Sequence, residues 1–204
     1  MSMRGVACAA FFLCAYGADA AACSCVKRSL QERLDDAEVV ALVRIDATRT
    51  SPDWVAQAAN DFPSYEARPV LADLTLVETL KGDASGIETL ATGFGGGDCG
   101  VNLIAGFDML VSGTPQAGVL EVGFCGEYRI LGPRSVLRWP EPPALHARDA
   151  AYLHAVRGYL LEGTPLHACA GFQDRPWSTP GEDAAHQAEC RAWIETFEDS
   201  RDDG

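Results

Sequence analysis

The residues most able to do chemistry in this sequence are its eight cysteines, two of which stand almost side by side. Cys23 and Cys25 enclose a single serine, Ser24, directly after the small residues at positions 20–22. Two half-cystines separated by one residue cannot easily pair with each other, because a disulfide requires a set distance and orientation of its Cα and Cβ atoms. A bond within this motif is therefore not expected.

Imidazole groups provide the second candidate chemistry. The four histidines all lie in the C-terminal third of the 204-residue chain: His146, His154, His167 and His186. None stands near a serine or cysteine with the pattern of a nucleophile, which Ser-His or Cys-His catalysis needs within hydrogen-bonding reach. His167 and Cys169 could form a metal pair, but no second pair shows the spacing of zinc ligands. The sequence therefore predicts surface histidines and no enzyme.

The glycine-rich residues 93–100 are the one stretch that could suggest a bound cofactor. They lack the Gly-Lys-Ser/Thr sequence of a phosphate-binding loop, and no helical pattern follows them. No cofactor is predicted for this chain.

The first 22 residues have the composition of a secretory signal peptide. Arg4 precedes an apolar run at 6–16 that is too short to span a bilayer, and small residues follow it. Removal of this segment takes away Cys8 and Cys14. Six cysteines remain: Cys23, Cys25, Cys99, Cys125, Cys169 and Cys190. An even number in an exported chain predicts disulfides, with fifteen possible pairings, in a secreted or periplasmic protein with no membrane span.

The charge of the chain excludes two classes of partner. There are 29 acidic and 16 basic side chains, which give a formal net charge of −13. Nucleic acids and anionic membrane surfaces repel such a chain, so neither is expected as a partner. The charge alone does not identify a protein partner.

The hydrophobic pattern predicts a mainly β domain that begins with a short helix. Ser29 and Glu32 have the spacing of a capping box, which predicts a helix at 30–36. Short apolar runs bounded by turn residues predict five strands: 38–46, 70–80, 87–92, 107–112 and 118–123. Five short strands at this spacing favour a small antiparallel barrel.

Residues 48–69 interrupt the strands and predict a long loop. They are polar and contain three prolines. Their aromatic side chains, which include Trp54 and Tyr65, either fold back onto the barrel or contact a partner protein. Both residues are therefore candidates for partner binding.

The pattern changes after residue 131. A proline-rich connector precedes apolar residues at helical spacing, which predict helices at 144–161 and 183–198. Cys169 lies between these two helices and Cys190 within the second, so these two cysteines most economically pair with each other.

Five features in this order make the chain similar to the netrin-like module of the tissue inhibitors of metalloproteinases. They are Cys23-Ser24-Cys25, a strand at 39–45, a strand that ends at 80–82, the Asp98-Cys99-Gly100 motif before 104–106, and Cys125 at the end of 122–125. The resemblance covers residues 23–131. It implies a mainly β fold, a five-stranded OB-like antiparallel barrel with flanking helices. The C-terminal helices are an extension outside the resemblance.

The resemblance divides the chain and implies its disulfides. Residues 1–22 are the signal peptide, 23–132 the netrin-like barrel, and 133–204 a linker with a two-helix C-terminal extension. The family ties its two N-terminal cysteines to later strands, which implies the bridges Cys23–Cys99 and Cys25–Cys125. The third core bridge of the family has no counterpart here, and a Cys169–Cys190 bridge belongs to this chain alone.

The resemblance also implies a function. In this family the α-amino nitrogen and carbonyl oxygen of the first cysteine chelate the catalytic zinc of a protease and displace its activated water. It follows that Cys23 binds the zinc of a target metalloendopeptidase and that Ser24 enters its specificity pocket, with Cys25 and Val26 beside them. Catalytic zinc keeps an open position that a rigid bidentate group can occupy.

Two alternatives stay open on the sequence alone. Signal cleavage after Ala22 frees the amine of Cys23, whereas cleavage after Ala20 leaves two alanines in front of it, and acylation of Cys23 blocks the amine. The other alternative is a netrin-like module that binds a different exported protein and inhibits no protease.

Overall fold

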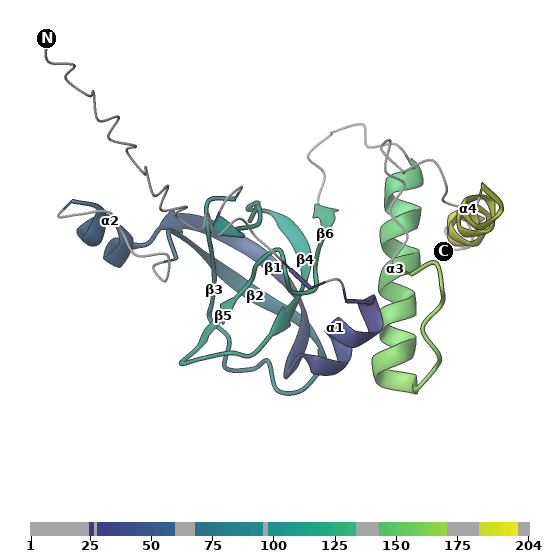
Figure 1. Ribbon diagram of the computed structural model, residues 1–204, viewed down its shortest axis with the longest axis horizontal. Coiled ribbons are helices and arrows are strands. Elements are labelled where there is room, and N and C mark those ends of the chain that lie inside the picture. The colour runs from purple at the N-terminus through teal and green to yellow at the C-terminus, as the bar shows by residue number, and fades with distance from the viewer. Residues whose placement is uncertain are drawn as a thin grey trace, which may run out of the picture.

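The computed structural model describes residues 25–26, 28–59, 68–95, 98–133, 143–170 and 184–199. Within these residues the fold is mixed α/β, with one six-stranded sheet and four helices (Figure 1). The strands are β1 (Val39–Thr50), β2 (Val70–Lys81), β3 (Thr89–Thr92), β4 (Phe107–Gly113), β5 (Val119–Glu121) and β6 (Tyr128–Pro133). The helices are α1 (Leu30–Asp36), α2 (Pro52–Ala58), α3 (Pro143–Glu162) and α4 (Ala184–Asp199).

The sheet is strongly curled. Its strand order is β5-β3-β2-β1-β4-β6, and every pair is antiparallel except β3 with β5, which is parallel. The two edge strands, β5 and β6, follow one another in the chain and are separated only by residues 122–127. So short a connection brings the two edges of the sheet toward each other, because each residue spans at most about 3.6 Å.

The observed sheet differs from the predicted five-stranded antiparallel barrel. A sheet-based core is present, but the sheet has six strands in the described residues, contains one parallel pair and is not a closed barrel. The additional strand is β6, which the sequence pattern did not predict. Its residues, Tyr128–Pro133, include an arginine and a glycine and show no long apolar run.

The first part of strand β1, residues 39–43, is buried on both faces, which explains why these five residues are all apolar, whereas residues 46–50 are exposed. Val39, Val43 and Ile45 point to one side and belong to the main core inside the curl of the sheet. Val40 points to the other side, where it packs with Leu34 of α1 and with α3. Successive side chains of a strand alternate between faces, so one run of residues serves two cores.

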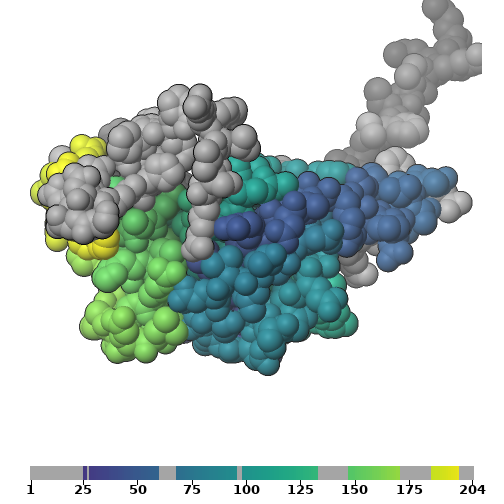
Figure 2. All heavy atoms as spheres, turned by 180° about the vertical axis from the view of Figure 1, so that it is seen from behind, coloured from purple at the N-terminus to yellow at the C-terminus, as the bar shows by residue number. Residues whose placement is uncertain are grey.

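A helical layer covers the outer face of the sheet. The second core joins α1, β1 and α3, so these helices pack directly on the strands. Figure 2 shows this contact from behind, with the green atoms of α3 against the blue and teal atoms of the sheet. Helix α4 packs on α3 through Ile194, which lies against Ala147 and Ala151. None of the helices in the described part of the chain combines the length and apolar character needed to cross a membrane.

The predicted helices at 30–36, 144–161 and 183–198 are confirmed as α1, α3 and α4. The capping box is present, since the Ser29 hydroxyl accepts a hydrogen bond from Glu32 N and the Glu32 carboxylate accepts one from Ser29 N. The prediction of a long loop at 48–69 is wrong for its first part, because β1 continues to Thr50 and α2 follows. Ser51 caps α2, and Pro52 occupies its first turn, where a missing backbone N–H costs nothing.

Candidate functional site

The N-terminal segment of the described chain is fastened to the turn between β5 and β6. A disulfide joins Cys25 to Cys125 with a Cα separation of 5.2 Å, across 100 positions of sequence. This is one of the two N-terminal bridges that the resemblance implied. Both half-cystines are exposed, so the bond lies at the surface and not in a core.

Two apolar side chains stand in solvent beside this bridge. Val26 is 82% exposed and Phe124 is 63% exposed, and each is the chain neighbour of a bridged cysteine. Large apolar side chains this open are unusual on a monomer when they stand together, and they typically mark a surface that contacts another molecule. The bridge holds them on one rigid edge, which we call the clamp edge (Cys25, Val26, Phe124 and Cys125).

A second anchor lies next to the first. The backbone N–H of Phe124 donates to the carbonyl oxygen of Cys99 at 2.9 Å, so Cys99 lies beside the turn that carries Cys125. Cys99 is itself disulfide-bonded. Its expected partner, Cys23, lies outside the described residues, as does Ser24. The two cysteines of a Cys-x-Cys motif can be bonded in two different places only if two partner cysteines lie close to each other. Cys99 and Cys125 meet this requirement.

The loop that carries Cys99 is held in shape by Asp98. The Asp98 carboxylate accepts hydrogen bonds from the backbone N–H groups of Phe94, Gly95 and Gly100 at 2.6, 2.8 and 3.1 Å. Burial raises the pKa of Asp98, but these backbone hydrogen bonds outweigh burial and leave the pKa below its ordinary value. The loop is therefore organised around an ionised carboxylate.

Glycine is required where this loop crosses itself. A Cβ on Gly100 would lie 2.3 Å from the carbonyl carbon of Gly93, closer than any real Cβ contact. Cys99 has φ of +60°, a left-handed conformation that costs energy for a side-chain-bearing residue. A disulfide and the bonds around Asp98 hold the strained residue in place. The glycine-rich sequence thus builds a tight, preformed loop beside the clamp edge.

Arg28, which lies just before α1, is also fixed. Arg33 of α1 donates through Nη1 to the carbonyl oxygen of Arg28 at 2.5 Å. Arg28 in turn pairs with Asp36 at the end of the same helix and donates to the carbonyl oxygen of Glu32 at 3.1 Å. Helix α1 therefore holds Arg28, which lies two positions after Val26 of the clamp edge.

A buried carboxylate ties the clamp edge to the helical layer. Glu127 is 8% exposed, and its carboxylate accepts hydrogen bonds from Arg33 Nε at 2.6 Å and from the Tyr152 hydroxyl at 2.5 Å. Its backbone N–H and carbonyl both bond to the Ser112 hydroxyl. The Arg129 guanidinium stacks over the Tyr152 ring at 4.2 Å. Burial raises the pKa of Tyr152 well above its ordinary value, and the neighbouring Glu127 raises it further.

A pocket of 770 Å³ opens between the clamp edge, α1, β6 and Tyr152. Three arginines line it, and each is paired with a carboxylate: Arg28 with Asp36, Arg33 with Glu127, and Arg129 with Asp149. The charges in this pocket are therefore matched within the protein. The arrangement fits a support for the clamp edge better than a site for a charged ligand.

Helix α2 contacts the same glycine-rich loop. The Trp54 ring meets the Phe94 ring edge to face, with 5.0 Å between centroids. Of the two aromatic residues proposed to bind a partner, Trp54 is thus partly buried against this loop, and Tyr65 lies outside the described residues. Phe94 is still 57% exposed. Neither Phe94 nor Phe124 was predicted as a site residue, although Phe94 lies in the glycine-rich stretch before Cys99 and Phe124 directly precedes Cys125.

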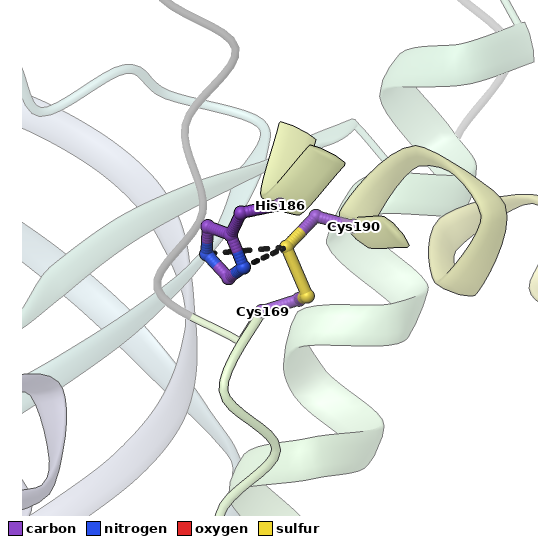
Figure 3. Close-up of side chains that lie close together, drawn as sticks. All are labelled: Cys169, His186 and Cys190. Carbon is purple, nitrogen blue, oxygen red and sulfur yellow. Dashed lines mark hydrogen bonds between the residues drawn. A yellow bond between two sulfur atoms is a disulfide. The ribbon is translucent and has the colours of Figure 1, made fainter. Parts of the chain in front are cut away.

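A separate cluster lies in the helical layer. Cys169, in the turn after α3, is bridged to Cys190 of α4 with a Cα separation of 5.2 Å, as the sequence predicted. The His186 imidazole lies against this bridge, with Nε2 at 3.6 Å and Nδ1 at 3.9 Å from the Cys190 sulfur (Figure 3). No second metal pair was predicted from the sequence, yet His186 and Cys190 are four residues apart on one helix face.

No known family model matches this chain, and no curated protein matches it either. The clamp edge and the elements that hold it are therefore the best indication of its activity.

Proposed function

We propose that this protein is an exported inhibitor of a zinc metalloendopeptidase, similar to the tissue inhibitors of metalloproteinases, and that it acts through its N-terminal segment. The observation that carries the proposal is the Cys25–Cys125 bridge, which fixes the start of the described chain on a surface edge that exposes Val26 and Phe124. An inhibitor needs a rigid, protruding segment, because a preordered segment loses little entropy on binding.

The topology of the sheet supports an OB-type barrel as the scaffold. Strand β3 pairs in parallel with β5, the chain then passes through 122–127, and β6 pairs with β4 in the antiparallel sense. Strands β5 and β6, which follow one another in the chain, thus form the two opposite edges of the curled sheet. We take them as the two halves of the last strand of a partly open five-stranded barrel. The OB-type assignment and the netrin-like relationship are part of the proposal.

The proposed chemistry takes place at Cys23 and Ser24, just before the described residues. After cleavage behind Ala22, the free α-amino nitrogen and the carbonyl oxygen of Cys23 bind the protease zinc in the position of its activated water. The amine must be unprotonated to bind, which its ordinary pKa of about 7.7–8.0 permits near neutral pH. Ser24 then occupies the specificity pocket, and Val26 and Phe124 contact the rim of the protease cleft.

The deciding experiment compares two forms of the exported chain that differ only at the N-terminus. One begins at Cys23, and the other retains Ala21-Ala22. Both are tested as full-length mature proteins against zinc endopeptidases that keep an open fourth zinc position. We expect inhibition by the first form alone and a loss of inhibition in Ser24→Arg, which places a long cation in the specificity pocket. The absence of inhibition by the form with a free Cys23 amine contradicts the proposal.

The exposed edge supplies a matched pair of variants for the same assay. Phe124→Asp places a charge on the clamp edge, whereas Leu161→Asp does so at a comparably open position of α3, where the leucine is 54% exposed. We expect Phe124→Asp to weaken inhibition and Leu161→Asp to leave it unchanged. Equal effects of the two substitutions would show that the inhibitory surface lies elsewhere.

The second candidate is a non-inhibitory netrin-like module that binds another exported protein. The exposure of Phe94 near the clamp edge favours it, because a surface of this kind can bind a partner without a free amine. The two forms of the chain separate the candidates. A partner bound equally well by the chain that starts at Ala21 and by the chain that starts at Cys23 supports the module.

A further inference from the structure

The turn after α3 and the helix α4 bring three side chains with soft ligand atoms to one point. The Cys169 and Cys190 sulfurs and a ring nitrogen of His186 all lie within 4.8 Å of one another. Figure 3 shows the imidazole directed at the bridge from one turn earlier on α4. We propose that this cluster is a redox-gated zinc site, which binds Zn²⁺ when the Cys169–Cys190 disulfide is reduced. The site lies in the helical layer and does not depend on the proposed inhibitory function.

The distances fit tetrahedral zinc. With Zn–S near 2.3 Å and Zn–N near 2.05 Å, sulfur and nitrogen ligands lie about 3.6 Å apart, and two sulfurs lie about 3.8 Å apart. The His186 Nε2 atom is already 3.6 Å from the Cys190 sulfur. The two sulfurs separate when the bond between them is reduced, and zinc then holds them about 3.8 Å apart. A rotation of each thiol side chain can supply this movement.

Contacts other than the disulfide keep Cys169 in place. Its backbone N–H donates to His167 Nδ1 at 3.2 Å, and Ala170 N donates to the carbonyl oxygen of His167 at 2.9 Å. The His167 ring stacks on Trp193 of α4, with centroids 4.3 Å apart and planes within 4° of parallel. The turn and α4 are thus joined beside the bridge, so the two thiols remain neighbours after reduction.

The surroundings also suit a metal. The Glu189 carboxylate lies 3.9 Å from His186 Nδ1, where it can orient the imidazole and leave Nε2 for zinc, as acidic partners of zinc-bound histidines do. Both cysteines are buried, whereas the His186 side chain is 48% exposed. The fourth coordination position therefore faces the solvent side, where water can fill it.

The redox step is a thiol–disulfide exchange with an external dithiol. Two electrons pass from the dithiol to the Cys169–Cys190 bond, which yields two thiols here and one disulfide in the reductant. Zinc then replaces the two thiol protons, which leave to solvent, because the thiolate is the metal ligand. In the oxidised protein both sulfurs are bonded to each other, so the site does not exist. The bond state decides whether the metal binds.

The test uses the full-length mature chain, with Zn²⁺ as the probe. Zinc binding is measured by competition with a chromophoric chelator before and after reduction with a phosphine. The matched control is Cys169→Ala/Cys190→Ala, which keeps every other cysteine. We expect the reduced wild type to bind one more tight zinc per chain than the reduced double alanine variant does. We also expect His186→Ala to weaken that zinc about tenfold or more, whereas His154→Ala on α3 leaves it unchanged.

Cobalt gives an independent readout. Co²⁺ in the reduced wild type should show thiolate-to-cobalt charge-transfer absorption that the double alanine variant lacks. His186 is exposed, so its replacement leaves the fold intact and its effect reports on the ligand itself. Three results each overturn the proposal: equal zinc affinity in the oxidised and reduced protein, equal affinity in the double alanine variant, or equal affinity in His186→Ala.

Discussion

The two bridges seen in the described residues are the same chemical bond in opposite settings. Cys25–Cys125 lies at the surface, spans 100 positions and has exposed apolar neighbours. Cys169–Cys190 is buried, spans 21 positions and has a histidine against it. The first fixes a segment that solvent and other molecules can reach, and the second lies within a layer of helices. The difference indicates that the setting of a disulfide, and not its presence, points to its role.

The largest expected effects come from removing each bridge in turn. In the chain-entropy model a bridge over 21 residues stabilises by about 3.3 kcal/mol, and one over 100 residues by about 4.7 kcal/mol when no other bridge spans the same loop. Cys99 lies within the 25–125 loop and is also disulfide-bonded, so the Cys25–Cys125 bridge contributes less than this larger value. We therefore expect Cys25→Ser/Cys125→Ser to lower the free energy of unfolding by about 4 kcal/mol, and Cys169→Ala/Cys190→Ala by about 3 kcal/mol. Serine suits the exposed pair and alanine the buried pair, since a buried hydroxyl adds its own cost.

Urea unfolding of both double variants measures these two losses, and limited proteolysis locates them. The first variant should be cut between the N-terminal segment and α1, and the second in the helical layer, with the sheet intact in each case. A larger loss for the 169–190 pair than for the 25–125 pair would reverse the comparison. So would proteolysis of the sheet in the second variant, because it would make the buried bridge a support of the whole fold.

The second prediction concerns Glu127, which connects the two regions. Glu127→Gln removes the charge that Arg33 pairs with and disturbs the hydrogen bond from Tyr152. Removing one member of a buried ion pair costs about 3 kcal/mol or more, because the other charge is left without compensation. The matched control is Glu121→Gln, whose exposed pair with Arg68 is worth less than about 1 kcal/mol. Unfolding free energies of the two variants within about 1 kcal/mol of each other would show that Glu127 is no such connection.

The clamp edge and the helical layer also differ in how far the sequence predicts them. Local signals were sufficient for α1, α3 and α4, since the capping box at Ser29 and Glu32 and the apolar spacing of α3 and α4 each lie within one element, whereas α2 was predicted to be a loop. The Cys169–Cys190 pairing followed from chain proximity alone. These features depend on neighbours in sequence, and sequence pattern describes neighbours well.

What the sequence pattern missed depends on contacts between distant residues. Strand β6 is specified by its pairing with β4 and by burial of Glu127 against α1 and α3, and none of these partners is local. Phe124 becomes a candidate contact residue only because the fold leaves it exposed beside a bridge. The parallel pairing of β3 with β5 likewise joins two segments that are apart in sequence, and no local turn signal indicates that they pair.

The smallest expected effect is a difference between the two regions in how their stability depends on pH. The pKa of Asp98 lies below its ordinary value in the folded loop, because its backbone hydrogen bonds outweigh burial. A lowered folded pKa stabilises the loop above the unfolded pKa, and that stabilisation is lost as the pH falls through the folded value. The helical layer responds in the opposite range. The raised pKa of Tyr152 gives stability that is complete below its unfolded value and falls as the pH rises beyond about 10.

An acid titration followed by NMR tests the Asp98 prediction. The amide resonances of Phe94, Gly95 and Gly100 should move together in one step below about pH 4, because their three N–H groups donate to the same carboxylate. Asp98→Asn should abolish the step, whereas Asp83→Asn, in a turn where the pKa is also lowered, should leave it in place. Separate midpoints for the three amides would mean that Asp98 does not organise the loop, and the loop would then give the clamp edge no rigid support.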